Sequence, residues 1–127
     1  MPSTSLFSRT AEYAPFVLRT ALAAVVMWFG AQQLMAPDMW VSWVPAWAGV
    51  FGMSPETLVF INGSFEVVAG ALLLAGIFTR AVAFFLFVHM AILVWEFGGT
   101  PVGVRDFGLA MGLLTLALDD RSKWALS

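Results

Sequence analysis

Four long apolar runs, joined by short polar or proline-containing connections, constrain this chain more than any other feature of its sequence. Each run approaches or exceeds the roughly 20 residues that an α-helix needs to cross about 30 Å of hydrocarbon. The sequence therefore predicts an all-α membrane protein, a bundle of four transmembrane helices that forms one domain over residues 1–127. The predicted spans are residues 14–36, 55–78, 80–97 and 101–118.

Capping residues indicate where the later helices begin. Ser54 and Thr100 each precede a proline, and a hydroxyl side chain followed by proline is a strong helix-start signal. Thr79 is the expected cap of the third span. The first span is longer than the core of a signal peptide and lacks a convincing cleavage site, so we interpret it as a retained helix.

Composition supports a membrane protein and excludes several other classes. Hydrophobic residues make up 61% of the chain and charged residues only 11%, against about 25% charged residues in soluble domains. The net charge of −2 gives no basic surface for nucleic acid. With no cysteine and one histidine, the chain offers no disulfide, no thiolate-ligated cluster and no multi-histidine metal site.

A Trp-rich segment, residues 38–53, separates the first two spans. Trp40, Trp43 and Trp47 fall near one helical face, although a proline and a glycine interrupt regular helix. Indole rings favour the headgroup level of a bilayer, which indicates a segment that lies in the membrane interface. A lid over a pocket in the bundle is the alternative.

Basic residues predict the orientation, because cytoplasmic connections carry an excess of lysine and arginine. If both termini are cytoplasmic, only Arg105 lies at the outer side. The basic residues on or near the cytoplasmic side are then Arg9, Arg19, Arg80, Arg121 and Lys123.

One carboxylate, Glu66, falls in the middle of the second span, roughly 16–18 Å from either surface. A charge at the bilayer centre costs about 2.5–3.5 kcal/mol, so Glu66 should face the inside of the bundle and have a partner. His89 in the third span lies at nearly the same depth, about 15 Å from the cytoplasmic end. We expect Glu66 to be protonated or to pair with His89, Asn62 or an arginine, and a Glu66–His89 hydrogen bond is the first choice. Gln33 is expected near the outer edge, and the charge state of Glu66 stays open.

Polar and small residues recur on one face of each predicted helix, so four inward faces would form a polar seam. Glu66 and His89 are candidate catalytic residues, because intramembrane ionisable groups are functional by default. Candidate ligand-binding residues along the seam are Arg19, Gln33, Asn62, Glu66, His89, Arg105 and Asp106. Glycines expected at close helix contacts, within the bundle or across a dimer, are Gly63, Gly70, Gly108 and Gly112.

Each charged candidate also has a purely structural interpretation. Arg19 could be a cytoplasmic anchor that extends its guanidinium to the headgroups. Glu66 and His89 could form a satisfied pair that fixes helix register. Arg105 and Asp106 could form a surface pair at a helix start.

Short motifs in a fixed order along the chain carry a resemblance to a known family. They are Leu18-Arg19, Gly30-Ala-Gln-Gln-Leu34, Gly63-x-x-Glu66-x-x-x-Gly70, Gly76-Ile-Phe-Thr-Arg80, His89 and Val104-Arg-Asp106. With these motifs, residues 14–120 resemble the DoxX/DoxD-like family of small four-span bacterial membrane proteins. The resemblance implies a multi-pass protein of the bacterial cytoplasmic membrane. Family members usually carry a lysine where this chain has Gln33. The resemblance therefore implies no cationic role at that position.

The resemblance also implies a function. Some relatives are linked to membrane oxidoreductase complexes, and the DoxD-type relative is the small subunit of a thiosulfate:quinone oxidoreductase. The chain is therefore expected to be a membrane subunit of a redox assembly, in which the seam binds a lipophilic ligand such as a quinone or relays protons. The sequence shows no cofactor of its own, so electrons would come from a soluble or membrane partner. Alternatives are a non-catalytic scaffold or assembly subunit and a small-solute transporter; enzymatic activity and homo-oligomerisation stay open.

Overall fold

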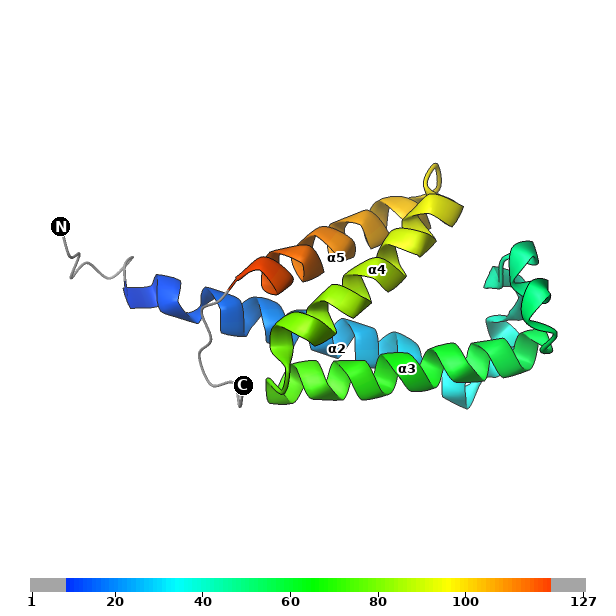
Figure 1. Cartoon of the computed structure of the whole chain (residues 1–127), viewed down its shortest axis with the longest axis horizontal. Coiled ribbons are helices and arrows are strands. Elements are labelled where there is room, and N and C mark those ends of the chain that lie inside the picture. Colours follow the sequence, from blue (N-terminus) through cyan, green and yellow to red (C-terminus); the bar gives the residue numbers. More distant parts are fainter. Residues whose placement is uncertain (1–8, 120–127) are drawn as a thin grey trace.

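Four long helices, arranged as two antiparallel pairs, make up most of the described chain (Figure 1). The structure, a computed structural model, describes residues 9–119. A short 3₁₀ turn, Ala11–Tyr13, leads into the first long helix, and no strand occurs within residues 9–119. The long helices are α2 (Ala14–Met35), α3 (Pro55–Ala75), α4 (Thr79–Phe97) and α5 (Pro101–Leu118). All four are long and apolar enough to cross a membrane, which confirms the predicted all-α four-span fold.

The orientation in the membrane stays a prediction. Four spans place the start of α2 and the end of α5 on the same side of a bilayer. Two of the basic residues on which the orientation depends, Arg121 and Lys123, lie outside the described residues.

The predicted helix starts of α3 and α5 are confirmed in atomic detail. Ser54 Oγ accepts a hydrogen bond from the backbone N–H of Thr57 at 3.2 Å. Thr100 Oγ1 accepts one from the backbone N–H of Gly103 at the same distance. In both cases a proline occupies the first helical turn, where its missing N–H costs nothing.

The turn between α3 and α4 differs from its prediction. The helix α3 ends at Ala75 instead of residue 78, because Gly76 takes the left-handed conformation with a φ of 76°. The backbone N–H of Ile77 then bonds back to the carbonyl of Leu72 at 2.9 Å, which closes the helix end. The cap position of α4 belongs to Phe78, with a φ of 51°, and not to Thr79, which is the first helical residue.

Close backbone contact holds α2 against α3. A Cβ built on Gly63 would lie 2.9 Å from the carbonyl oxygen of Gly30, and one on Gly70 would overlap the side chain of Met27. Only glycine therefore fits at these positions without a shift of the neighbouring helix. On α5, a Cβ on Gly112 would lie 3.3 Å from Leu22 Cδ1, a tight contact with a flexible side chain, whereas Gly108 has no atom within 4 Å of its would-be Cβ among the described residues. Packing of Gly108 within the bundle is thus not observed.

The two helix pairs meet near the α3–α4 turn and diverge away from it (Figure 1). The buried apolar core lies at the narrow end and takes side chains from all four helices. Its largest fully buried side chains are Val26, Leu73, Leu86 and Leu113. At the wide end, the polar residues of the predicted seam take the place of this core.

The Trp-rich segment lies across the wide end as a series of 3₁₀ turns, Pro37–Met39, Val41–Trp43 and Ala46–Phe51. Ring contacts join it to both helix pairs. Trp40 packs edge-to-face on Phe29 of α2, with ring centroids 5.9 Å apart, and Trp43 does so on Phe97 of α4 at 5.5 Å. Trp47 Nε1 donates a hydrogen bond of 3.1 Å to Glu96 Oε2. The segment therefore covers the space between the pairs, as the lid alternative describes.

Candidate ligand-binding site

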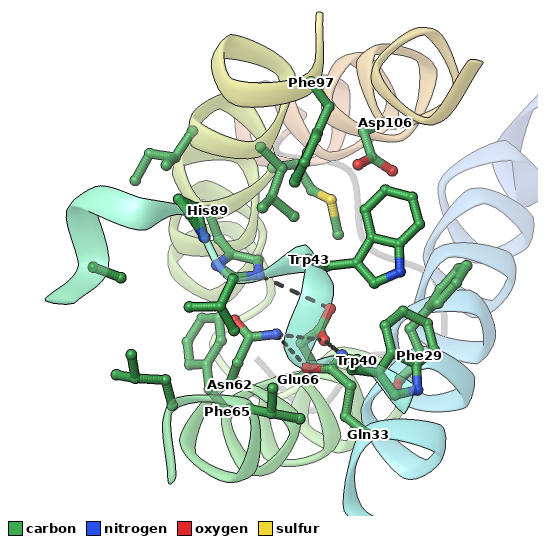
Figure 2. Close-up of a pocket in the computed structure, with 18 of the residues that line it drawn as sticks. Phe29, Gln33, Trp40, Trp43, Asn62, Phe65, Glu66, His89, Phe97 and Asp106 are labelled. Carbon is green, nitrogen blue, oxygen red and sulfur yellow. Dashed lines mark hydrogen bonds and ion pairs between the residues drawn. The ribbon is translucent and has the colours of Figure 1, made fainter. Parts of the chain in front are cut away.

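A cavity of about 600 Å³ lies between the two helix pairs, beneath the Trp-rich segment (Figure 2). All four long helices and the segment contribute to its lining. Most of the lining is aromatic or aliphatic, with polar groups at two places. Ligand sites in proteins are typically cavities of this size and character, roughly 300–1,000 Å³ with a few fixed polar groups.

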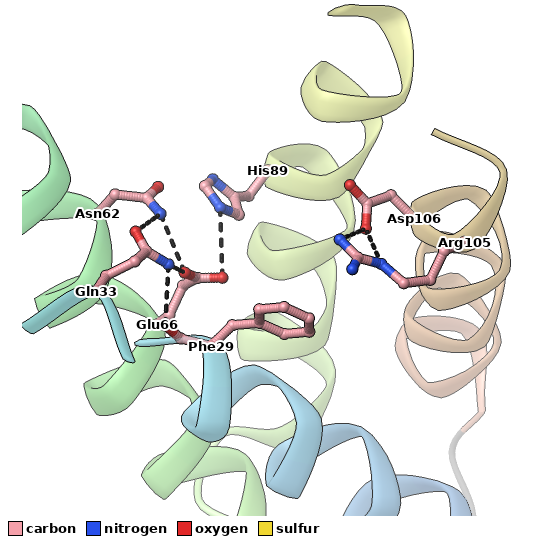
Figure 3. Close-up of polar contacts among 7 residues, drawn as sticks. All are labelled: Phe29, Gln33, Asn62, Glu66, His89, Arg105 and Asp106. Carbon is pink, nitrogen blue, oxygen red and sulfur yellow. Dashed lines mark hydrogen bonds and ion pairs between the residues drawn. The ribbon is translucent and has the colours of Figure 1, made fainter. Parts of the chain in front are cut away.

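The first polar group of the cavity centres on Glu66, which is 2% exposed (Figure 3). Glu66 Oε1 accepts hydrogen bonds from the amide nitrogens of two residues, Gln33 and, at 3.0 Å, Asn62. The two amides also bond each other, because Asn62 Nδ2 donates to Gln33 Oε1 at 2.7 Å. Gln33 Nε2 donates its second hydrogen to the carbonyl of Phe29 at 3.2 Å. Both amide nitrogens therefore use both of their hydrogens, and the network fixes the orientation of the carboxyl group.

Two polar atoms remain beside this network without a hydrogen bond from the described residues. Glu66 Oε2 faces His89 Nε2 across 3.9 Å, which is longer than a hydrogen bond. His89 Nε2 is buried and has no other partner within residues 9–119. The edge of the His89 ring packs against Phe65, with centroids 5.3 Å apart. Glu66 and His89 thus line the cavity side by side, and their facing atoms, Oε2 and the buried Nε2, form no hydrogen bond among the described residues.

These contacts correct the predicted partner of Glu66. His89 is its neighbour but not its hydrogen-bond partner, and Gln33 bonds it instead. The sequence predicts Gln33 near the outer edge because its depth is counted along α2, as if all helices began and ended at the same two membrane surfaces. In the structure α3 begins beyond the end of α2, and Gly30 lies opposite Gly63. This stagger brings Gln33 to the level of Asn62 and Glu66.

The second polar group of the cavity is an arginine–aspartate pair at the start of α5 (Figure 3). Nε and Nη2 of Arg105 both donate to Asp106 Oδ1, at 3.1 and 3.0 Å. The Asp106 side chain is buried, whereas that of Arg105 is about half exposed. The Arg105 guanidinium also lies over the ring of Phe29, 4.6 Å from its centroid. The pair therefore joins α5 to α2 at one side of the cavity. The structural interpretation as a surface pair fits Arg105, which is half exposed, but not Asp106, which is buried.

Arg19 is separated from the other residues of the predicted seam. It does not line the cavity and lies on α2 about four turns before Gln33, with its guanidinium 5.4 Å from the ring of Phe16. Its side chain is buried, which disagrees with a cation that extends freely to the headgroups. The cavity thus unites the other candidate ligand-binding residues, Gln33, Asn62, Glu66, His89, Arg105 and Asp106.

Several aromatic lining residues escaped the sequence analysis. Phe29 supplies its backbone carbonyl to Gln33 and its ring to Arg105. Phe29 precedes Gln33 by four residues, so helical periodicity places both on one face and could have found it. Phe65 and Phe97 gave no such signal, because phenylalanines occur on every side of these helices. No cluster of three or more potential metal ligands occurs among residues 9–119.

Comparison with known proteins places the chain in a family. The family model described as DoxX matches residues 14–99. The chain belongs to the DoxX family. No curated protein and no solved structure matches it. The DoxX match covers α2, the Trp-rich segment, α3 and α4, and thus the Glu66 group of the cavity, while Arg105 and Asp106 lie outside it.

Proposed function

We propose that this DoxX-family protein is a membrane subunit of a redox assembly and binds a quinone-like ligand in its cavity. The observation that carries the proposal is the adjacent pair Glu66 and His89 in the lining of a mostly apolar cavity, with Oε2 and the buried Nε2 unpaired by hydrogen bonds among the described residues. Quinones are flat apolar rings with oxygen atoms at their edges, and such a site offers ring surfaces together with polar groups for those oxygens.

The ring walls and the polar groups have separate roles in this proposal. Phe29, Trp40 and Trp43 supply the apolar surface on which a flat ring packs. His89 Nε2 would hold one ring oxygen, and the Arg105 guanidinium, which also lines the cavity, would face the other. A bound quinone takes up two electrons and two protons when it is reduced, and the electrons would come from a partner protein.

The amide network determines which oxygen of the Glu66 carboxyl group would carry a proton. Because two amide hydrogens occupy Oε1, a proton on this carboxyl must reside on Oε2, beside His89 and the cavity. Glu66 and His89 are therefore placed to exchange protons with a ligand oxygen rather than with lipid. The pair would act as general acid and base at the cavity wall.

Quinone binding to the purified protein in lipid nanodiscs tests this proposal. The readout is quenching of tryptophan emission, since three indoles line the cavity. His89→Ala should weaken binding about tenfold, because about 1.4 kcal/mol is lost with one hydrogen bond. Glu66→Gln keeps the shape and much of the network, so it should bind with little change but lose proton-coupled reduction in the native complex.

The matched control is Glu56→Gln, the same change at an exposed position in the first turn of α3. It should leave both binding and reduction unchanged. Unchanged behaviour of His89→Ala and of Glu66→Gln would refute the proposal. Lower abundance of both variants, with unaltered binding and reduction per molecule, would support a non-catalytic scaffold instead.

We further infer that the protein resides in the bacterial cytoplasmic membrane with both termini inside. The excess of basic residues at that side supports this orientation. A cysteine introduced at the exposed Ser42 would be the only one in the chain, and a membrane-impermeant reagent should label it from the outer side.

A further inference from the structure

The two sides of the cavity, each between one helix of the first pair and one of the second, differ in how exposed their lining residues are. On each side, one helix of the first pair faces one helix of the second: α2 faces α5, and α3 faces α4. A lining residue that is also exposed shows where the cavity reaches the outside of the protein. The distribution of such residues between the two sides therefore shows where a ligand can enter.

On the side between α2 and α5, only the polar Arg105 both lines the cavity and is about half exposed. None of its apolar lining residues, Phe29, Val102 and Leu109, belongs to the exposed class. The stacked contact of Arg105 on Phe29 bridges the two helices there. The Arg105 guanidinium is held both by the face of the Phe29 ring and by Asp106. These two contacts fix the position of Arg105 between α2 and α5.

The side between α3 and α4 is open at the level of the polar site. Ile61, Phe65 and Ile92 all line the cavity, yet they are 47%, 38% and 46% exposed. Counted from Pro55, Ile61 and Phe65 lie roughly 9 and 15 Å into the span, which is within the hydrocarbon of a bilayer. The contact of Phe65 with His89 marks the inner end of this opening, next to Glu66 (Figure 2).

We propose that this opening, bordered by Ile61, Phe65 and Ile92, is a lateral portal through which an amphiphile with a long hydrocarbon tail enters from the bilayer. The inference rests on the proposed quinone-like ligand and names its subclass. About 600 Å³ suits a drug-sized head group, so a tail long enough to anchor in a membrane must extend out of the cavity. Passage through lipid also avoids hydrating the tail, at about 0.8 kcal/mol per CH₂ group.

The test uses two benzoquinone probes with the same ring. One carries a long alkyl tail with a photoreactive diazirine, and the other has no tail. In nanodiscs, the tailed probe should crosslink saturably to peptides of α3 and α4, and the tail-less probe should compete. Crosslinks that map to α2 and α5 instead would overturn the portal while leaving ring binding, and thus the proposed function, intact.

A pair of variants tests the opening independently. Ile61→Trp with Ile92→Trp should fill the portal, weakening the tailed probe at least tenfold and leaving the tail-less one within about twofold. Val68→Trp with Val88→Trp adds the same bulk to exposed positions of the same helices that do not line the cavity, and should change neither. An unchanged affinity of the tailed probe for the filled variant would overturn the portal. Failure of the wild type to bind either probe would overturn the proposed function and this inference with it.

Discussion

The two ends of the bundle use the same four helices in opposite ways. Near the α3–α4 turn, leucine, valine and alanine side chains fill the space between the helix pairs completely. At the other end the pairs diverge, polar groups take the place of the apolar core, and a cavity remains. On α4 the change occurs within two turns, between the fully buried Leu86 and the cavity-lining Leu93.

This difference separates the packed core from the candidate ligand site within one short chain. In lipid, helices gain no hydrophobic energy by associating, so packing contacts and hydrogen bonds hold them together. The narrow end supplies the packing that the wide end gives up. The wide end is held by the α2–α3 glycine contact and by the ring contacts of the Trp-rich segment instead.

The glycine contact between α2 and α3 should give the largest effect on stability. Gly63→Ala is expected to lower the free energy of unfolding by about 3 kcal/mol. The added Cβ would lie 2.9 Å from the backbone oxygen of Gly30, so the backbones of α2 and α3 must move apart to accept it. Gly108→Ala, on the open face of α5, is the matched control and should not lower it, because alanine meets no neighbouring atom there and favours helix over glycine by up to about 1 kcal/mol. Unfolding in detergent by a denaturing surfactant measures both. Equal losses would mean that glycine contact does not hold the wide end together.

A matched leucine pair on α4 tests the contrast between the two ends directly. Leu86→Ala should cost about 2 kcal/mol of unfolding free energy, near the low end for such truncations because packing alone is lost in lipid. Leu93→Ala only enlarges an existing cavity and should cost less than about 1 kcal/mol. The same unfolding measurement applies. A larger loss for Leu93 would show that the wide end is packed as tightly as the narrow one.

The smallest effect is expected at the rim of the cavity. Trp47→Phe removes the hydrogen bond to Glu96 but keeps an aromatic ring, and the bond is exposed, so the loss should be about 0.5 kcal/mol. Trp95→Phe, at a position 89% exposed, should have no measurable effect on stability. Thermal unfolding curves of the two variants should differ by a few degrees at most. A loss as large as that of Leu86→Ala would make the rim a structural element of the bundle.

Sequence reasoning predicted the fold well because membrane-spanning helices leave local signals. Apolar runs of sufficient length, with Ser54 and Thr100 before prolines, predicted seven of the eight helix boundaries within one residue. The end of α3 and the cap of α4 were less accurate. They depend on left-handed backbone at Gly76 and Phe78, and a phenylalanine gives no sign of it in the sequence.

The sequence predicted most of the residues of the candidate site, but fewer of the contacts between them. Burial of Glu66 and its proximity to His89 follow from the cost of a charge in lipid, and both are observed. The bond from Gln33 depends on how far α3 extends past α2, which the contact of Gly30 with Gly63 determines. Such a stagger is a tertiary property that no single helix encodes. The separation of Arg19 from Gln33, by contrast, follows from their spacing of 14 residues along one helix.

The connection between the helix pairs controls the geometry of the distant cavity. Only residues 76–78 join α3 to α4, and two of them, Gly76 and Phe78, hold left-handed conformations. A connection so short and so constrained leaves little freedom in the angle between these helices. Since the pairs diverge from this point, a few degrees of change there would become ångströms at the far end of the bundle. The width of the cavity is thus set at the α3–α4 turn, roughly 15 Å along α3 from Glu66.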